Sequence, residues 1–484
     1  MIRVRTDIAD SQGDAARRVM SLEAHTIYPI PHSERHGRTR DLFTVWFGCN
    51  LMMLTVATGA LGTTVFGLPL LWAIGASTLG MVVGGVFMAL HAAQGPRLGV
   101  PQMVQTRGQF GSWGAAPIVM MMVLMYVGFA ASNCVLGGQS LQLAVPAISR
   151  DQGILLIVAS TILPALLGYN AIHAAARLTT WFGGAAILYC LWRATALLPL
   201  SAWTAGQVTM TGLLGSVSTG ALWQIAYAPY VSDASRYLRA DQSGVRASFW
   251  ASYGGSVLGS LLPTILGAEL GLMAGHGDLA HTLGWVSGPF SLPVVVVMSF
   301  SIAIANAVNV YCGTLSTITV VQTFVSRWRA GLAARVVVTL GLTGLAAYLS
   351  LAMADNFLHS YTAFLELLMA VMVPWTAINL IDYYVVCHGS YDVDAFFARG
   401  GGIYGRWNVS ALLSYAVGIA CQIPFLSTPL YVGPIARRLA GADISWAVGL
   451  LVTTPVYLLA VRVLDRSRGA PTLASPISRA SCTP

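Results

Sequence analysis

Amide and aromatic side chains inside apolar stretches are the residues of this sequence whose types and spacing best suit chemistry. Asn306 and Asn309 lie three positions apart in "NAVNVY", so they project from one face of a helix. Trp223 and Gln224 precede Pro229 in "WQIAYAPYVSDASRYL". An amide offers a donor and an acceptor, and an indole offers a flat apolar face with one donor. Together these groups indicate recognition of a planar ligand with polar edges.

Weaker signals of the same kind come from another polar pair and from acidic residues. Tyr126 and Asn133 are seven positions apart, so they also share a helix face, although tyrosine is common in apolar helices. Glu366 lies in the middle of "TAFLELLMAVMVPW", and Glu269 lies near the end of another apolar stretch. Carboxylates in such surroundings are typical of proton relays, with an internal hydrogen bond as the competing interpretation. Glu366 is the better candidate for ion coupling.

Catalytic and metal-binding motifs are not found in the sequence. The nine histidines are scattered without HExxH or other metal-ligand spacing, and the seven cysteines form no CxxC pair. Walker loops and GxSxG are equally missing. We therefore expect no enzyme, no metal centre and no cofactor.

The composition requires that these residues be positioned by helices in a membrane. Hydrophobic residues make up 56% of the 484 residues, charged residues make up 9%, and the mean hydropathy is +0.69. Soluble domains carry about 25% charged residues. A bilayer core needs roughly 20 apolar residues per helix. We predict an all-α integral membrane protein with 12 transmembrane helices, at 42–66, 70–93, 115–143, 152–169, 179–200, 211–236, 248–274, 289–314, 332–353, 357–386, 407–427 and 444–464.

The distribution of arginine predicts how the helices are oriented. All 26 basic residues are arginine, and 22 of them fall on the side of the N-terminus; the others are Arg150, Arg193, Arg437 and Arg438. This bias predicts a multi-pass protein of the plasma or inner membrane with both termini in the cytoplasm. The bilayer also accounts for the net charge of +8, so nucleic acid is not an expected partner. The first 40 residues contain no apolar run, so no cleavable signal peptide is expected.

Two predicted spans are interrupted in corresponding ways. The first contains Gly48 and Asn50, and the sixth contains Gln224 and Pro229. Because the two spans lie five helices apart, units of the same plan must be inverted relative to each other. We therefore predict a 5+5 inverted repeat. The expected divisions are a cytoplasmic, poorly ordered tail at 1–40, repeats at 41–205 and 206–390, two accessory helices at 391–464, and a second such tail at 465–484.

The interruption at Pro229 has two interpretations. Proline removes a backbone donor and can simply kink a helix. Alternatively, backbone groups left unpaired at membrane depth face a cavity, which makes the interruption a binding site. Trp223 can likewise anchor an interface, and Asn306 with Asn309 can bond neighbouring helices, but both sites lie inside their spans and favour ligand contact. Asp233 and Arg236 are interpreted as a helix cap and a cytoplasmic anchor.

Four stretches resemble the nucleobase–cation symporter-1 family, in its purine–cytosine permease branch. The loop "GPRLGVPQMVQTRGQFGSWG" is similar to the family signature through Gly99, Pro101, Arg107 and Gly111. Agreement continues in "APYVSDASRYL", "NAVNVY" and "PWTAINLIDYYVVCHGSYD", and spans residues 26 to 465. The resemblance implies a LeuT-like fold of ten core helices in two inverted repeats, followed by two further helices.

The resemblance also implies a binding site. In the family, aromatic side chains of the third and sixth spans sandwich the substrate and amides contact its edge. The third-span aromatic falls on Tyr126, where relatives commonly carry Trp, and the polar residue often found four positions later falls on Ala130, which cannot donate or accept. The other positions fall on Trp223, on Asn309 or Asn306, and on Asn50.

Sodium-coupled relatives use backbone carbonyls at the first break, here at Trp46 and Cys49, together with hydroxyls of the eighth span. At the matching turn this chain has Ala303 and Ile304, and Ser299 and Ser301 lie only nearby. Sodium needs hard oxygen ligands, so we expect the coupling cation to be a proton.

We therefore expect a secondary active transporter that imports a nucleobase, cytosine or a purine, by cation symport through alternating access. One alternative is a symporter of the same fold for another N-heterocycle: allantoin, hydantoin, uracil or a vitamin-like compound. A channel or a receptor is the alternative from a different class. The sequence leaves the oligomeric state open.

Overall fold

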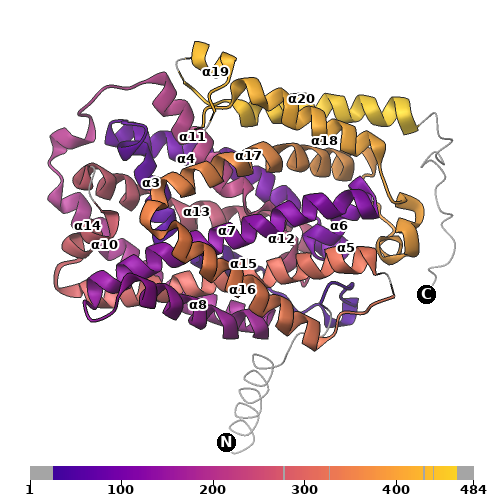
Figure 1. Ribbon diagram of the computed structural model, residues 1–484, viewed down its shortest axis with the longest axis horizontal. Coiled ribbons are helices and arrows are strands. Elements are labelled where there is room, and N and C mark those ends of the chain that lie inside the picture. The colour runs from indigo at the N-terminus through magenta and orange to yellow at the C-terminus, as the bar shows by residue number, and fades with distance from the viewer. Residues whose placement is uncertain (1–25, 276–277, 326, 429–430, 440, 466–484) are drawn as a thin grey trace, which may run out of the picture.

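The computed structural model describes residues 26–275, 278–325, 327–428, 431–439 and 441–465. These residues form a bundle of helices that run largely alongside one another (Figure 1). The long helices are α4 (Leu70–Ala92), α7 (Ser112–Ala144), α8 (Arg150–Leu167), α13 (Gln242–Ala274), α15 (Ser291–Phe324), α16 (Leu332–Met353), α17 (Phe357–Ile381) and α20 (Ser445–Ala460). Shorter helices are α5 (Gly95–Leu98), α6 (Gln102–Phe110), α9 (Tyr169–Leu178), α10 (Gly184–Leu197), α14 (Leu279–Ser287), α18 (Val409–Gln422) and α19 (Pro434–Arg438).

Each of the twelve predicted segments contains a helix, but not every helix alone is long enough to cross a bilayer. Within the described ranges, eight helices meet that length and composition, and one bent pair meets it jointly. The segments at 179–200, 211–236 and 407–427 are built from helices shorter than 18 residues. A π-helical turn, η2 (Thr179–Gly183), starts the first of them, and a break divides the second.

Both predicted interruptions are real breaks. In the first span, α2 (Thr39–Asn50) and α3 (Met53–Thr64) meet at an angle of 58°. In the sixth, α11 (Met210–Ile225) ends before α12 (Ala228–Ser235), and Pro229 lies in the first turn of α12. Proline is tolerated there because first-turn amides have no partner within the helix. The break therefore starts a new helix rather than kinking an old one.

Close helix contacts hold the broken spans in place. The α2–α3 pair packs on α13, α11 packs on α4, and α7 packs on α15. A Cβ atom at Gly267 of α13 would lie 1.9 Å from the carbonyl oxygen of Val56 on α3. Only glycine permits this approach, as small residues do at helix interfaces in membranes.

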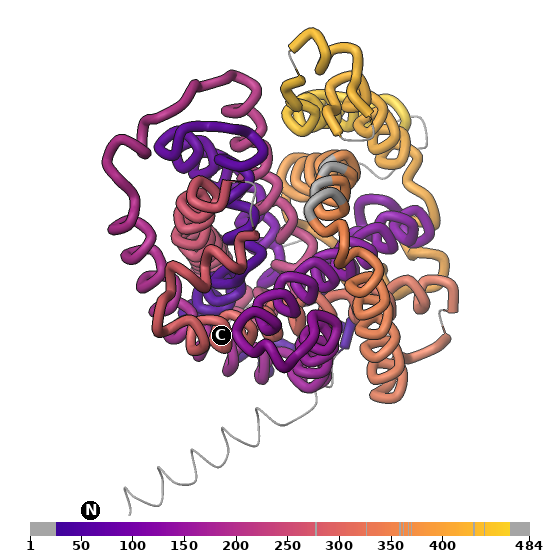
Figure 2. Tube along the Cα trace, turned by 60° about the vertical axis from the view of Figure 1, so that its left-hand side comes forward, coloured from indigo at the N-terminus to yellow at the C-terminus, as the bar shows by residue number. Residues whose placement is uncertain are grey.

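The accessory helices lie on one side of the bundle. In Figures 1 and 2, α18 and α20 lie together beside α17. Asp382 of the π-helical turn η6 (Asp382–Val386) connects α20 to the core, because it accepts a hydrogen bond from Tyr457 of α20 over 2.6 Å. It also accepts a hydrogen bond from Tyr391.

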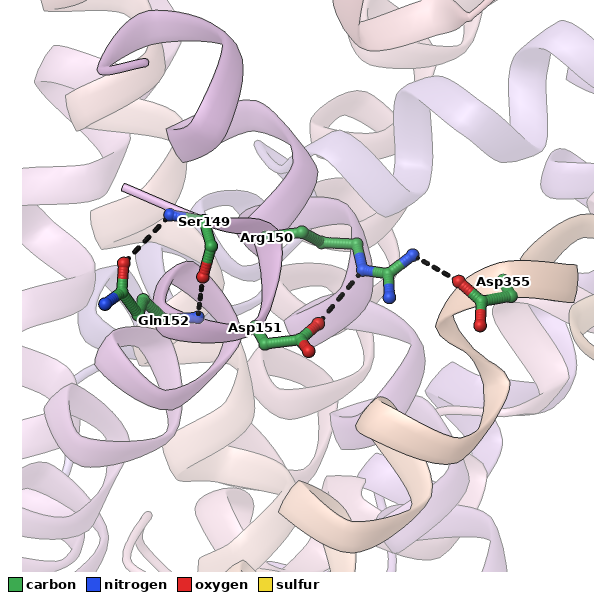
Figure 3. A network of polar contacts seen from close by, with 5 residues as sticks. All are labelled: Ser149, Arg150, Asp151, Gln152 and Asp355. Atoms are coloured by element: carbon green, nitrogen blue, oxygen red, sulfur yellow. Dashed lines mark hydrogen bonds and ion pairs between the residues drawn. The ribbon is translucent and has the colours of Figure 1, made fainter. Parts of the chain in front are cut away.

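The N-terminal end of α8 carries a network of polar contacts, shown in Figure 3. Ser149 and Gln152 form a capping box, in which each side chain accepts the other residue's backbone N–H. Arg150 extends between Asp151 and Asp355, and its guanidinium lies 2.6 Å from the Asp355 carboxylate. Asp355 belongs to η5 (Ala354–Asn356), which joins α16 to α17. This contact therefore connects α8 to the α16–α17 junction.

Two expectations about polar segments are wrong. Residues 26–40 are not a poorly ordered tail, since Ile27 and Ile30 are buried among the helices. Residues 1–25 and 466–484 lie outside the described ranges. Asp233 and Arg236 do not anchor the chain at an interface, because both are buried. Asp233 accepts the backbone N–H of Gln102 over 2.8 Å.

Candidate functional site

A cavity lies where the two broken spans meet. Its walls come from four places in the chain, and its volume is about 20 Å³, room for roughly one water molecule. The lining residues are Cys49 and Met52 at the first break, Trp223, Ala226, Tyr227 and Tyr230 at the second, Phe129 and Asn133 on α7, and Ala305, Val308 and Asn309 on α15. Among the described residues of this wall there is no charged side chain.

Asn50 connects the two breaks from behind the cavity wall. Its side-chain oxygen accepts the indole N–H of Trp223 over 2.7 Å and the hydroxyl of Tyr227 over 3.2 Å. Its amide nitrogen donates to the carbonyl oxygen of Trp46 over 2.7 Å. Asn50 is fully buried and does not line the cavity, so it positions the rings that do.

Four aromatic residues, Phe129, Trp223, Tyr227 and Tyr230, line the cavity. Phe129 and Trp223 meet edge to face, with ring centroids 6.2 Å apart and planes at 85°. Tyr126, the aromatic residue expected here, is not in this wall. Its hydroxyl donates to the Pro229 carbonyl over 2.9 Å, and its ring packs edge-on against Tyr230 at 4.6 Å. Tyr126 therefore supports the second break from outside the cavity.

The amides on α7 and α15 form a chain with a defined polarity. The amide nitrogen of Asn306 donates to the backbone oxygen of Ala130 over 3.2 Å, which directs its own oxygen toward Asn133. Asn133 donates its amide nitrogen to that oxygen over 2.8 Å, and its oxygen has no partner among the described residues. On the cavity wall, Asn309 accepts the Tyr230 hydroxyl over 2.6 Å.

Gln224 points away from the cavity. Its amide nitrogen donates to the hydroxyl of Ser260 over 2.8 Å, and its oxygen accepts the hydroxyl of Ser256 over 2.6 Å. Adjacent residues on a helix point about 100° apart, so Gln224 faces α13 while Trp223 faces the cavity. The structure thus brings Trp223, Asn133 and Asn309 together at the cavity, but not Gln224.

The predicted ion-coupling residues lie on two elements, with Trp46 and Cys49 on α2 and Glu366 on α17. The Trp46 carbonyl already accepts from Asn50, and Cys49 presents its side chain to the cavity. On α15, Ser301 donates to the Val297 carbonyl over 3.0 Å, and the Ser299 hydroxyl is buried without a described partner.

Of the two carboxylates predicted to lie in the membrane, only the side chain of Glu269 is among the described residues. Glu366 lies on α17, but its side chain is outside the described residues. Glu269 on α13 is buried and accepts the Thr195 hydroxyl over 2.7 Å. Among the described residues, no group of three or more His, Cys, Asp and Glu could hold a metal ion.

The signature residues build the loop before α7 and do not line the cavity. Gly99 has φ +68°, and a Cβ atom there would lie 2.4 Å from the Arg35 guanidinium. Pro101 starts α6, and Gly111, with φ +79°, starts α7. Arg107 is buried and donates to the carbonyls of Phe396 and Thr319. Burial lowers the pKa of Arg107 to about 10, so this side chain stays charged at neutral pH.

Several wall residues were not singled out from the sequence. Phe129 lies four positions before Asn133, on the same helix face. Tyr227 and Tyr230 follow Trp223 by about one and two turns across the break. The shared face of Phe129 and Asn133 was a usable signal. The positions of the two tyrosines depend on the bend, which residue spacing does not reveal.

Comparison with known proteins agrees with this architecture. Residues 29–449 match the family described as permease for cytosine/purines, uracil, thiamine, allantoin. The putative purine-cytosine permease YxlA of Bacillus subtilis is 36% identical over 450 residues, covering 92% of this chain and 96% of that protein. The purine-cytosine permease fcyB of Emericella nidulans is 24% identical over 462 residues, covering 91% and 88%.

A solved structure shares the fold. The structure of Mhp1, a nucleobase-cation-symport-1 family transporter in a closed conformation with bromovinylhydantoin bound, has a TM-score of 0.72 at 17% identity. The match covers 92% of this chain and 96% of Mhp1. With its broken helices and apolar spans, this chain belongs to the purine–cytosine permease family of nucleobase–cation symporters, whose members are membrane permeases and not enzymes.

Proposed function

We propose that this protein imports a neutral nucleobase, cytosine or a purine, by proton symport. It would do so through alternating access across the plasma or inner membrane, with both termini in the cytoplasm. The observation that carries the proposal is the Asn133 side-chain oxygen, buried at the cavity wall without a described partner. A buried acceptor of this kind costs about 1–3 kcal/mol, which a bound N–H group can recover.

The amide polarity favours a substrate with a donor and an acceptor on one edge. Asn133 offers an acceptor because its nitrogen is taken by Asn306. Asn309 offers its amide nitrogen because its oxygen is taken by Tyr230. Cytosine and adenine carry an amino donor beside a ring-nitrogen acceptor, which complements this pair. A wall without described charges favours a neutral base over a carboxylate or an amine.

The aromatic wall supports a stacked substrate, with the aromatic position of α7 at Phe129 instead of Tyr126. Phe129 with Asn133 reproduces the family spacing of an aromatic residue followed by a polar residue four positions later. In this register Asn133, rather than Ala130, is the polar residue that would hydrogen-bond the substrate. The small cavity and the 85° angle between Phe129 and Trp223 mean that the rings must separate and turn before a base can stack.

Proton coupling is favoured over sodium coupling. The turn at Ala303 and Ile304 supplies no side-chain oxygen, and the Trp46 carbonyl is already bonded to Asn50. Both features reduce the number of hard oxygen ligands that sodium needs.

Uptake into cells lacking their own base permeases tests the proposal. Labelled cytosine, adenine, hypoxanthine and uracil would each be offered with and without an uncoupler and with and without sodium. We expect one of them to accumulate against its gradient and to leak out after uncoupler addition, with no sodium requirement. Equilibration without accumulation would instead indicate a channel. Accumulation of no base would move the substrate to another N-heterocycle.

A matched pair of variants tests the residue that carries the proposal. Asn133→Ala should lower the affinity for the transported base at least tenfold. Ser132→Ala, the neighbouring buried position outside the cavity wall, should leave the affinity unchanged. Equal affinities for the two variants would contradict the assignment of Asn133.

A further inference from the structure

A second cavity continues the path from the first. It shares Tyr230 and Val308 with the first cavity, and its other walls include Asp233, His173 and Tyr169. Its volume is also about 20 Å³. Because one tyrosine and one valine border both cavities, rotation of these two side chains would join the two spaces.

The second cavity lies toward the side that the arginine distribution predicts to be cytoplasmic. Asp233 belongs to α12, the half of the sixth span that follows the break. Arg239 follows in the loop after α12, and Arg246 lies near the start of α13. A molecule leaving the first cavity toward the cytoplasm would therefore pass through the second cavity.

Residues 26–37, here named the strap, pack against two walls of this second cavity. Ile30 of the strap packs in one cluster with Tyr169, Ala234 and Tyr237. Two members of that cluster, Tyr169 and Ala234, are also walls of the second cavity. Ile27 and Ile30 are buried, although they belong to a segment whose composition predicts a solvated tail.

Hydrogen bonds attach the strap to the end of the broken span. The Arg236 guanidinium donates to the Thr26 carbonyl over 3.0 Å, and the Gly37 N–H donates to the Tyr237 carbonyl over 2.9 Å. The strap is thus bonded to the two residues that directly follow α12. Movement of α12 away from its neighbours requires these bonds to break or the strap to move with it.

Further bonds attach the strap to the signature loop. The Ile30 N–H donates to the Gly99 carbonyl over 3.0 Å. Arg35 donates to the Ile30 carbonyl over 3.1 Å and also to the Pro96 carbonyl. The absence of a side chain at Gly99 leaves room for this guanidinium. The strap therefore joins α5 and the residue after it to the end of α12, next to the cavity walls Tyr169 and Ala234.

We propose that the strap is the inner gate of the transport path and that the second cavity is the chamber through which cargo leaves. The proposal rests on the proposed function for the identity of the cargo, a planar heterocycle. Opening requires Ile30 to leave its cluster with Tyr169 and Tyr237, after which the chamber meets the cytoplasm. The gate would therefore consist of three segments that lie far apart in the sequence: the strap, the signature loop and the end of the broken sixth span.

A native thiol in the chamber reports on the gate. Cys312 lines the second cavity and is buried. In a protein that keeps Cys312 as its only cysteine, inside-out vesicles would be treated with a membrane-impermeant maleimide. Ile30→Asp should raise the labelling rate at least tenfold, because a carboxylate cannot remain in the apolar cluster. Ile403→Asp, the same substitution at an exposed position outside the strap, should leave the rate unchanged.

A second reporter separates gate opening from unfolding. Cys134 is equally buried on α7 but lines neither cavity. Its labelling, in a protein with Cys134 alone, should not respond to Ile30→Asp. Arg35→Gln, which removes bonds to Ile30 and Pro96 without entering the cluster, should raise Cys312 labelling by a smaller factor. An unchanged Cys312 rate in both variants, or an equal rise at Cys134, would overturn the proposal.

The readout does not depend on which base is carried. Faster Cys312 labelling in a protein that accumulates no nucleobase would leave the gate standing and reject the proposed cargo. Normal base accumulation with unchanged labelling would reject the gate and leave the proposed function standing.

Discussion

Trp223 donates its indole N–H to the side-chain oxygen of Asn50 over 2.7 Å, and this bond joins the two broken spans at their breaks. The same oxygen accepts from Tyr227, so one amide holds two rings of the cavity wall. Because all three residues lie on the two interrupted helices, the orientation of the aromatic wall depends on how these helices meet.

Asn50→Ala should reduce both stability and transport. The indole N–H of Trp223 would lose its partner while remaining buried, which costs about 1–3 kcal/mol. The freed ring would no longer be held toward Phe129, so we expect at least a tenfold loss of base affinity. Thermal unfolding in detergent and equilibrium binding of the transported base measure the two effects.

Asn408→Ala is the matched control. Asn408 caps α18 by accepting the Ala411 N–H, far along the chain from the cavity residues. Loss of a cap costs about 0.5–2 kcal/mol. The control should therefore lower the unfolding temperature without changing base affinity, and a comparable loss of affinity in both variants would contradict the role assigned to Asn50.

The register of α7 is tested by a pair of neighbouring aromatic substitutions. Phe129→Ala removes a ring of the cavity wall and should abolish measurable base binding. Tyr126→Phe removes only the hydroxyl that bonds to the Pro229 carbonyl, so base affinity should change less than threefold. Titration of purified protein with the transported base distinguishes them. Strong loss in Tyr126→Phe with binding intact in Phe129→Ala would restore the register that places Tyr126 at the substrate.

Composition and residue spacing predict the helical class, the positions of the segments and both breaks. Each of these follows from local properties: apolar length, the missing donor of proline, and small polar residues inside a span. The inward direction of Asn133 and Asn309 was predictable for the same reason, since a buried amide requires a partner. These features need no knowledge of which helix packs on which.

The misassigned residues depend on tertiary contacts that spacing does not encode. Gln224 satisfies its amide on Ser256 and Ser260, more than thirty positions away. The strap is polar in composition, yet its Ile30 packs in an apolar cluster with residues from α9 and the end of α12. Arg236 is buried because carbonyl and hydroxyl acceptors converge on it from Thr26 and Tyr311. In each case, the partner lies in a distant segment.

Docking of the accessory helix α20 depends on a buried carboxylate. Tyr457→Phe removes a hydrogen bond to Asp382 and should lower the free energy of unfolding by about 1.5–3 kcal/mol, the range for a hydrogen bond to an ionised carboxylate. Tyr415→Phe removes a bond from α18 to the Val371 carbonyl and should cost about 0.5–1.5 kcal/mol. Chemical denaturation of both variants in detergent measures the difference. A cost for Tyr457→Phe no greater than that for Tyr415→Phe would show that α20 does not depend on Asp382.

At the start of α8, the ion pair of Arg150 and the capping bond of Ser149 should respond differently to salt. Arg150 and Asp355 form an ion pair whose side chains are 28% and 85% exposed, so their coupling should be below about 1 kcal/mol. A double-mutant cycle with Arg150→Gln and Asp355→Asn should give a coupling that falls as salt is raised, because exposed charges are screened. Ser149→Ala removes the neutral capping bond of the same turn and should cost about 1 kcal/mol at every salt concentration. A salt-independent Arg150–Asp355 coupling larger than the capping contribution would contradict the assignment of this ion pair as an exposed contact that salt screens.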